Sequence, residues 1–132
     1  MIIEGAKSRG VAKFTFDFAV QGGTVGDIVL NGDPLPSKAI VWDGVVDILT
    51  PLTDGSDGTS ALSTAQSAND LISDTANSGA PWSSTGLKAI VPVGTQATAI
   101  KLTAERKPKL VVAGHDLTAG KFNLFLQYFL SD

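Results

Sequence analysis

The sequence contains no cysteine, a single histidine (His115) and no long uninterrupted apolar run. Without cysteine the chain has no disulfide, no thiolate catalysis and no Cys-ligated zinc. No stretch approaches the roughly 20 apolar residues that span a bilayer, and the opening "MIIEGAKSRG" lacks the apolar segment of a signal peptide. We therefore expect a soluble protein made in a cytoplasm, with no membrane partner, metal or cofactor.

Charge is also scarce. Charged residues make up 17% of the 132 residues, against about 25% in an average soluble domain, so more of the surface is available for packing. The charges are uneven, because nine aspartates lie between residues 14 and 76 and most lysines and arginines lie outside that range. These charges either sit on solvated turns and strand faces or pair within one fold or between neighbouring copies. The length predicts one domain, with an N-terminal arm over residues 1–10 and a single sandwich domain over 11–132.

The dominant period in the sequence is two. In "KFTFDFAV" (13–20) phenylalanines alternate with polar or small residues, as in a half-buried antiparallel strand. "AIVWDGVVDILT" (39–50) alternates as well, with Trp42 expected on the same face as Val46, and its mid-strand Gly44 indicates a bulge or a close backbone approach. Similar short segments follow at 87–93, 98–104, 109–114 and 121–130. About eight short strands predict an all-β antiparallel sandwich, of either jelly-roll or immunoglobulin-like topology.

Two segments break this rhythm. "SANDLISDTA" (67–76) has Ser67 as a possible helix cap with Asp70 three residues on, which predicts one short helical turn. "NSGAPWSSTG" (77–86) is irregular and carries Trp82 among small and polar residues. Trp82 either folds back over the domain or anchors a partner chain or a sugar, because tryptophan is favoured at binding hot spots; it is a candidate subunit-interface residue.

The side chains needed for catalysis are not arranged in a recognisable pattern. Asp43 and Asp47 lie about 13 Å apart along one strand face, and His115 has no nucleophile motif beside it. "DGSDG" (54–58) lacks the ligand spacing of a calcium loop. The basic "ERKPK" (105–109) has no interleaved aromatic residues, so we expect no direct contact with nucleic acid.

The closing segment "KFNLFLQYFL" (121–130) is apolar on both faces. Phe122, Leu124, Leu126, Tyr128 and Leu130 are expected to face the core. Phe125 and Phe129 fall on the opposite face, where a lone sandwich would meet water. They are therefore candidate subunit-interface residues, unless the N-terminal arm or the 77–86 segment covers them.

The segments "FTFDFAVQGGTVGDIVL", "AIVWDGVVDILTPLT", "VPVGTQATAIKLTA" and "LTAGKFNLFLQYFL" together resemble the head-decoration (cement) proteins of tailed bacteriophages and related small virion β-sandwich proteins. The resemblance runs in order over residues 12–130 and leaves out "PWSSTG" and the N-terminal arm. It implies a non-enzymatic subunit added in many copies to the outside of a DNA-filled head, where it clamps the major capsid protein. It also implies a symmetric homo-oligomer, with a trimer favoured.

Three other functions stay open at this point. A tail or baseplate subunit would have the same composition but another partner. A carbohydrate-binding sandwich would use Trp82, and an enzyme would need Asp43, Asp47 and His115 in one pocket.

Overall fold

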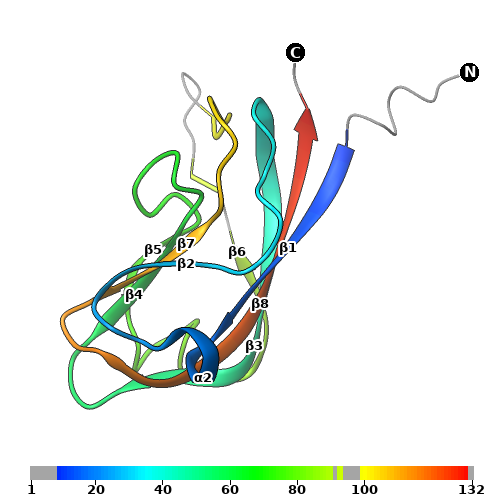
Figure 1. The fold of residues 1–132 in the computed structure, drawn as a ribbon. Coiled ribbons are helices and arrows are strands. Elements are labelled where there is room, and N and C mark those ends of the chain that lie inside the picture. Colours follow the sequence, from blue (N-terminus) through cyan, green and yellow to red (C-terminus); the bar gives the residue numbers. More distant parts are fainter. Residues whose placement is uncertain (1–8, 91, 94–98, 131–132) are drawn as a thin grey trace, which may run out of the picture.

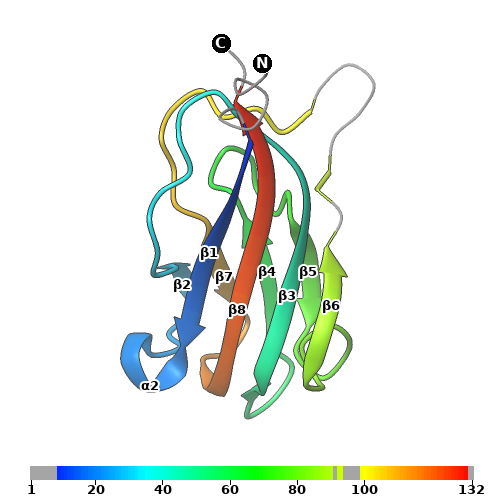
Figure 2. The same cartoon turned by 90° about the vertical axis from the view of Figure 1, so that its right-hand side faces the viewer.

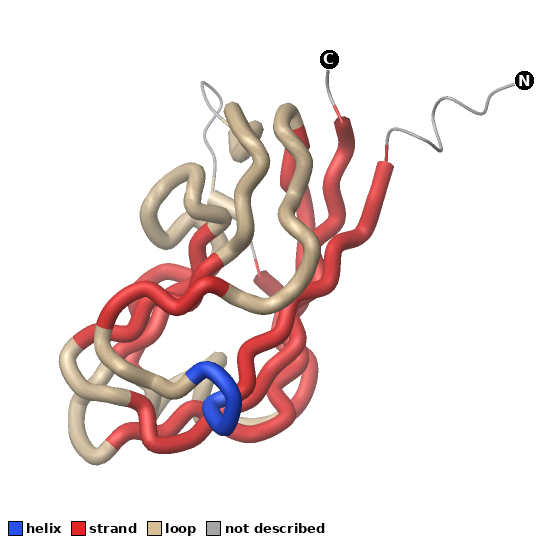
Figure 3. The backbone as a smooth tube through the Cα atoms, in the orientation of Figure 1, coloured by secondary structure: helices blue, strands red, loops and turns tan. Residues whose placement is uncertain are grey.

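The computed structural model describes residues 9–90, 92–93 and 99–130, which contain eight β-strands and one four-residue helix (Figures 1 and 3). In chain order the elements are β1 (Arg9–Asp17), α2 (Phe18–Gln21), β2 (Gly26–Val29), β3 (Ala39–Asp54), β4 (Thr59–Ser63), β5 (Ile72–Ala76), β6 (Gly86–Ile90), β7 (Lys109–Ala113) and β8 (Leu117–Leu130). The predicted all-β sandwich is confirmed.

The strands form two four-stranded antiparallel sheets, in the orders β1-β8-β3-β6 and β2-β7-β4-β5. Strand β1 pairs with β8, β2 with β7, β3 with β6 and β4 with β5. Each strand in the first half of the chain therefore pairs with one in the second half. The two halves together form one long antiparallel ribbon that wraps around the core. This is the jelly-roll arrangement, and it selects one of the two topologies that the sequence left open. Figure 2 shows the β1-β8-β3-β6 sheet in front of its partner sheet.

The core lies between the two sheets and is almost entirely apolar. Its largest fully buried members are Phe14 and Phe16 from β1, Phe122 from β8, and Trp82 from the connection between β5 and β6. The Phe16 and Phe122 ring centroids are 5.5 Å apart, and those of Trp82 and Phe122 are 5.9 Å apart. The alternation of β1 and β8 thus places their inward-facing phenylalanines in one cluster, as expected for half-buried strands.

The first strand begins and ends earlier than the pattern at 13–20 indicated, because it runs from Arg9 to Asp17. It ends at Asp17, whose carboxylate accepts a hydrogen bond from the Ala19 backbone N–H at 3.0 Å and caps the short helix α2. Gly22 ends this helix with a φ of 74°, a conformation that glycine adopts without strain. Val20, which the alternation in 13–20 would place on the same face as Phe14 and Phe16, is consequently exposed.

The helical turn predicted near 67–76 is wrong. Residues 65–71 form bends and turns, and Ile72–Ala76 is strand β5. The buried Asp70 carboxylate accepts bonds from the Thr64 N–H at 2.7 Å and the Thr64 hydroxyl at 2.5 Å. Asn69 and Ala65 have positive φ angles of 53° and 72°. Side-chain bonds to the backbone have replaced the helical pattern here.

The strand predicted over residues 98–104 is wrong as well, because none of the strands includes the described residues 99–104. In its place, residues on either side of Lys101 bond to the start of β3, with Leu102 N–H donating to the Ala39 carbonyl at 2.8 Å and Val41 N–H donating to the Ile100 carbonyl at 3.0 Å. Residue 98 lies outside the described part of the chain. This segment extends the sheet near the first residues of β3.

Strand β3 contains a bulge that reverses its faces. Val41 pairs with Tyr128 and Asp43 with Gln127, so Trp42 is the extra residue. Before the bulge Val41 faces the core, whereas after it Val46 and Ile48 do. Trp42, predicted on the core face, is therefore exposed. Just beyond it, a Cβ on Gly44 would lie 2.7 Å from the Phe125 carbonyl oxygen, which explains the glycine by close approach of β8.

Candidate interaction surface

The outer face of the β1-β8-β3-β6 sheet carries large apolar side chains on all four strands. We call this set the apolar outer face: Val11, Trp42, Val45, Leu87, Phe125 and Phe129. Trp42 is 48% exposed, Phe129 38% and Leu87 69%, and Phe125 is half-buried. Large apolar groups spread across one sheet face are unusual on an isolated domain and mark interaction sites.

The aromatic members of this face contact one another across strands. The rings of Trp42 and Phe129 are stacked, with centroids 5.6 Å apart and planes inclined by 17°. Phe125 pairs in register with Val45 on β3 and Lys13 on β1. The Lys13 ammonium lies 5.9 Å from the Phe125 ring centroid, within the range of a cation–π contact. Phe125 and Phe129 therefore lie on the face that the sequence predicted, and Trp42 joins them there.

Trp82 is not on this surface. It is 0% exposed, and its indole N–H donates to the Ser60 carbonyl at 3.1 Å. Its backbone carbonyl accepts from the Leu52 N–H at 3.0 Å. The 77–85 connection runs from one sheet to the other and inserts Trp82 between them. Of the two roles considered, Trp82 thus folds back into the domain, and its candidacy as an interface or sugar contact is wrong.

Burial of Trp82 also bears on what covers Phe125 and Phe129. The indole packs against Phe122, which points into the core from the opposite face of β8. The 77–86 segment therefore does not cover the apolar outer face. The other candidate cover, the predicted arm, lies outside the described residues except for Arg9 and Gly10, which already belong to β1.

The acidic and histidine side chains considered for catalysis have separate locations. Asp43 and Asp47 lie on the outer face of β3, in register with Gln127 and Asn123 of β8, whereas the exposed His115 lies in the turn between β7 and β8. Within the described ranges, no three histidine, aspartate or glutamate side chains gather into a metal-binding group. None of the helices described there is long and apolar enough to cross a membrane.

The "DGSDG" loop is held by its own hydrogen bonds. The Asp54 carboxylate accepts from the Asn77 side-chain amide at 2.6 Å and from the Ser56 N–H at 2.8 Å. These two bonds stabilise the charged form and lower the pKa of Asp54 below its ordinary value of 3.8. Asn77 accepts in turn from the buried Ser60 hydroxyl at 2.6 Å. This network ties the loop between β3 and β4 to the end of β5, which is a structural role.

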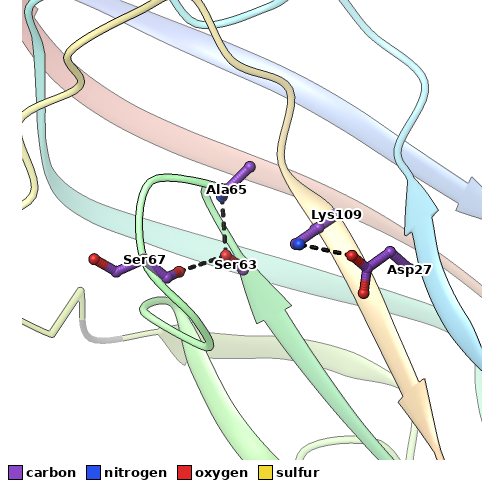
Figure 4. Close-up of polar contacts among 5 residues, drawn as sticks. All are labelled: Asp27, Ser63, Ala65, Ser67 and Lys109. Carbon is purple, nitrogen blue, oxygen red and sulfur yellow. Dashed lines mark hydrogen bonds and ion pairs between the residues drawn. The ribbon is translucent and has the colours of Figure 1, made fainter.

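Part of the basic "ERKPK" segment is used within the fold. Lys109 forms an ion pair with Asp27 at 2.7 Å (Figure 4), and the Arg106 guanidinium donates to the Gln66 side chain at 2.8 Å. Figure 4 also shows Ser63 bonded to Ala65 and to the Ser67 carbonyl in the neighbouring loop. These contacts fix loops at one end of the β2-β7-β4-β5 sheet.

The structure thus defines a jelly-roll sandwich with an apolar outer sheet face. In sequence, no protein-family model and no curated protein matches the chain. In structure, the chain is similar to a chain of the cyanophage Pam1 capsid asymmetric unit, with a TM-score of 0.64 and 18% identity over 93% of this chain and 85% of that chain.

Two further capsid structures have similar chains. One is from Helicobacter pylori bacteriophage KHP30, with a TM-score of 0.62 and 17% identity over 94% of this chain and 89% of that chain. The other is from Ralstonia phage GP4, with a TM-score of 0.59 and 19% identity over 93% of this chain and 86% of that chain. At these identities the similarity establishes a shared fold.

The members of the apolar outer face that sequence reasoning missed are Val11, Trp42, Val45 and Leu87. Val45 alternates with Asp43 and Asp47, so the pattern placed it on a polar strand face. Trp42 was assigned to the core because the bulge in β3 is not visible in a strict alternation. Val11 and Leu87 precede or begin their apolar segments, so each looked like an ordinary strand end. The sequence signal that could have found them is in β8, because Phe125 and Phe129 had already indicated that the outer face is apolar. The other strands of the same sheet share that face.

Proposed function

We propose that this protein is a non-enzymatic structural subunit of a bacteriophage virion, namely a decoration (cement) subunit on the outside of the head. It is made in the host cytoplasm, assembles as a homo-oligomer, with a trimer favoured, and binds the major capsid protein. The observation that carries the proposal is the apolar outer face, because a sheet face this apolar is stable when another protein surface covers it.

The shared fold supports a place in the capsid. Three phage capsid structures contain chains of this fold, and each aligns with more than nine-tenths of the present chain. Decoration, rather than another virion role, follows from the sequence resemblance described above. The trimer has the same source.

The positions of the polar side chains support a structural role, with neither catalysis nor nucleic-acid binding. Asp43 and Asp47 point outward from one strand, and His115 lies in a distant turn. Arg106 and Lys109 of the basic segment have partners within the fold. The carbohydrate-binding alternative depended on Trp82, which is buried.

A binding experiment tests the proposal directly. Purified protein is mixed with expanded phage heads that lack decoration and, separately, with tails, and bound protein is measured by co-sedimentation and located by electron cryomicroscopy. We expect saturable binding to heads at regular surface positions. Binding to tails alone would replace the proposal with a tail or baseplate role, and binding to neither particle would refute both.

The matched variants are Phe125→Asp with Phe129→Asp on the apolar outer face, and Val29→Asp on β2 of the other sheet. Val29 is also an exposed apolar residue. We expect the double variant to abolish oligomer formation and to weaken head binding, and Val29→Asp to preserve both. Equal effects from the two changes would show that general surface charge, not this face, is responsible.

A further inference from the structure

Charged side chains flank the aromatic centre of the outer face in two columns of opposite sign. The basic column is Arg9 and Lys13 on β1, and the acidic column is Asp43 and Asp47 on β3. Strand β8, with Phe125, lies between β1 and β3 (Figure 2). The order across the face is therefore basic, aromatic, acidic.

The two columns are level with each other along the strands. Lys13 and Val45 both pair in register with Phe125, and Val45 lies between Asp43 and Asp47 on the same face of β3. Lys13 thus stands at the height midway between the two carboxylates, two strands away. A separation of two strands is about 9.6 Å. None of these four charged groups forms an ion pair with another residue in the described part of the chain.

This order restricts how two copies can meet through this face. A rotation axis parallel to β8 keeps each residue at the same height along the strands in both copies. It brings the basic column on β1 of one copy toward the acidic column on β3 of the next. Lysine and arginine then meet aspartate, and Phe125 and Phe129 of the copies meet near the axis. Rotation about an axis perpendicular to the strands within the sheet plane would place like charge on like charge, which is unfavourable.

We propose that a second copy of this chain covers the apolar outer face, with the symmetry axis parallel to β8 and with Lys13 of one copy between Asp43 and Asp47 of its neighbour. The proposal rests on the homo-oligomer of the proposed function and adds its geometry. Such a contact combines buried aromatic groups with charged groups of opposite sign on either side of them, and polar groups beside an apolar centre are usual in specific interfaces. The charges determine which orientation forms.

Charge reversal tests this orientation. Lys13→Glu places a carboxylate between the neighbour's two aspartates, and the reversal of the acidic column (Asp43→Lys with Asp47→Lys) places an ammonium group on either side of the neighbour's Lys13, so each of the two reversals should raise the dissociation constant about tenfold or more. The combined variant restores opposite charges across the contact and should return the constant to within a few-fold of the unmodified protein. Lys107→Glu and Asp57→Lys, both at exposed loop positions, are controls for net charge and should change nothing.

Mixing the two separately reversed variants gives an independent result. A Lys13→Glu copy and a copy with both Asp43→Lys and Asp47→Lys present opposite charges to each other in both directions, whereas each variant alone repels itself. An equimolar mixture should therefore associate more tightly than either variant alone. In a mixed dimer both contacts between a β1 column and a β3 column pair opposite charges, and in a mixed trimer two of the three contacts do. Sedimentation velocity over a concentration series measures all these constants, and circular dichroism verifies that each variant is folded.

The outcomes separate the two proposals. If the unmodified protein assembles but the combined variant is as weak as the two separate reversals, the orientation is wrong and the oligomer stands. If the unmodified protein is monomeric at every concentration, the homo-oligomer itself is refuted. If removal of residues 1–8 then produces self-association, the N-terminal segment covers this face within one chain, and the second copy is again excluded.

Discussion

Replacement of Trp82 by alanine should strongly destabilise the domain. The indole is fully buried, packs against Phe122 and donates a hydrogen bond to the Ser60 carbonyl. Truncation of a buried aromatic side chain to alanine costs about 3–5 kcal/mol through lost contacts and the cavity left behind. Because a small domain is stabilised by only about 5–15 kcal/mol, this change removes a large share of the stability.

The chain contains a matched control, since its only other tryptophan is Trp42 on the apolar outer face. Trp42 is about half exposed and stacks only on Phe129 among the aromatic rings described. We expect Trp42→Ala to cost about 1 kcal/mol or less in the dissociated protein, as for other partly exposed positions. Trp82→Phe should fall between the two, because it keeps an aromatic ring and leaves the Ser60 carbonyl without its donor.

Urea denaturation followed by far-ultraviolet circular dichroism gives the free energy of unfolding for each variant. At about 3–5 °C per kcal/mol for a domain of this size, Trp82→Ala should lower the melting temperature by about 10–20 °C. Fluorescence gives a second readout: emission from the Trp42→Ala protein, which retains Trp82, should be blue-shifted relative to the Trp82→Ala protein. The reasoning is refuted if Trp82→Ala costs less than about 1 kcal/mol, or if Trp42→Ala costs as much.

Three further predictions follow from single contacts. Phe125→Asp combined with Phe129→Asp should give a folded monomer; an unchanged oligomer in sedimentation would contradict the interface, and loss of fold would make both rings core residues. Asp54→Asn should be less stable than the unmodified protein above about pH 4, and the difference should vanish as the pH falls through the lowered pKa of Asp54; a pH-independent difference in urea titrations would show that the charge of Asp54 is not the cause. Gly44→Ala should cost about 1–3 kcal/mol, because its Cβ would lie 2.7 Å from a β8 carbonyl oxygen, whereas Gly55→Ala, with open space around it, should be near neutral in the same assay.

Much of the fold was predictable because β1 and β8 follow the period-two pattern closely. Phe14 and Phe16 face the core as expected, as do Phe122, Leu124 and Leu126. Such alternation reports directly which face is buried. The choice between jelly-roll and immunoglobulin-like topology was not predictable, since it depends on which strands pair over long sequence distances, and each strand carries only its own pattern.

The errors have local physical causes. The bulge at Trp42 adds one residue to β3 and exchanges its faces, and a period of two gives no warning of such an insertion. At residues 67–76, the cap-like spacing of Ser67 and Asp70 was misread, because the Asp70 carboxylate bonds back to Thr64. Trp82 lay in a segment without periodicity, so nothing in the sequence indicated whether it pointed inward.

The position of β8 in its sheet explains why Phe125 and Phe129 were placed correctly on the outer face, whereas Trp42 was not. Jelly-roll pairing places β8 inside its sheet, between β1 and β3, so both of its faces belong to the middle of the sheet. Its inner face fills the core, and its outer face carries Phe125 and Phe129. A central strand that is apolar on both faces is expected where both faces are covered. The second sheet covers one face, and the bulge adds Trp42 to the other, which is why we propose a second covering layer on the outer face.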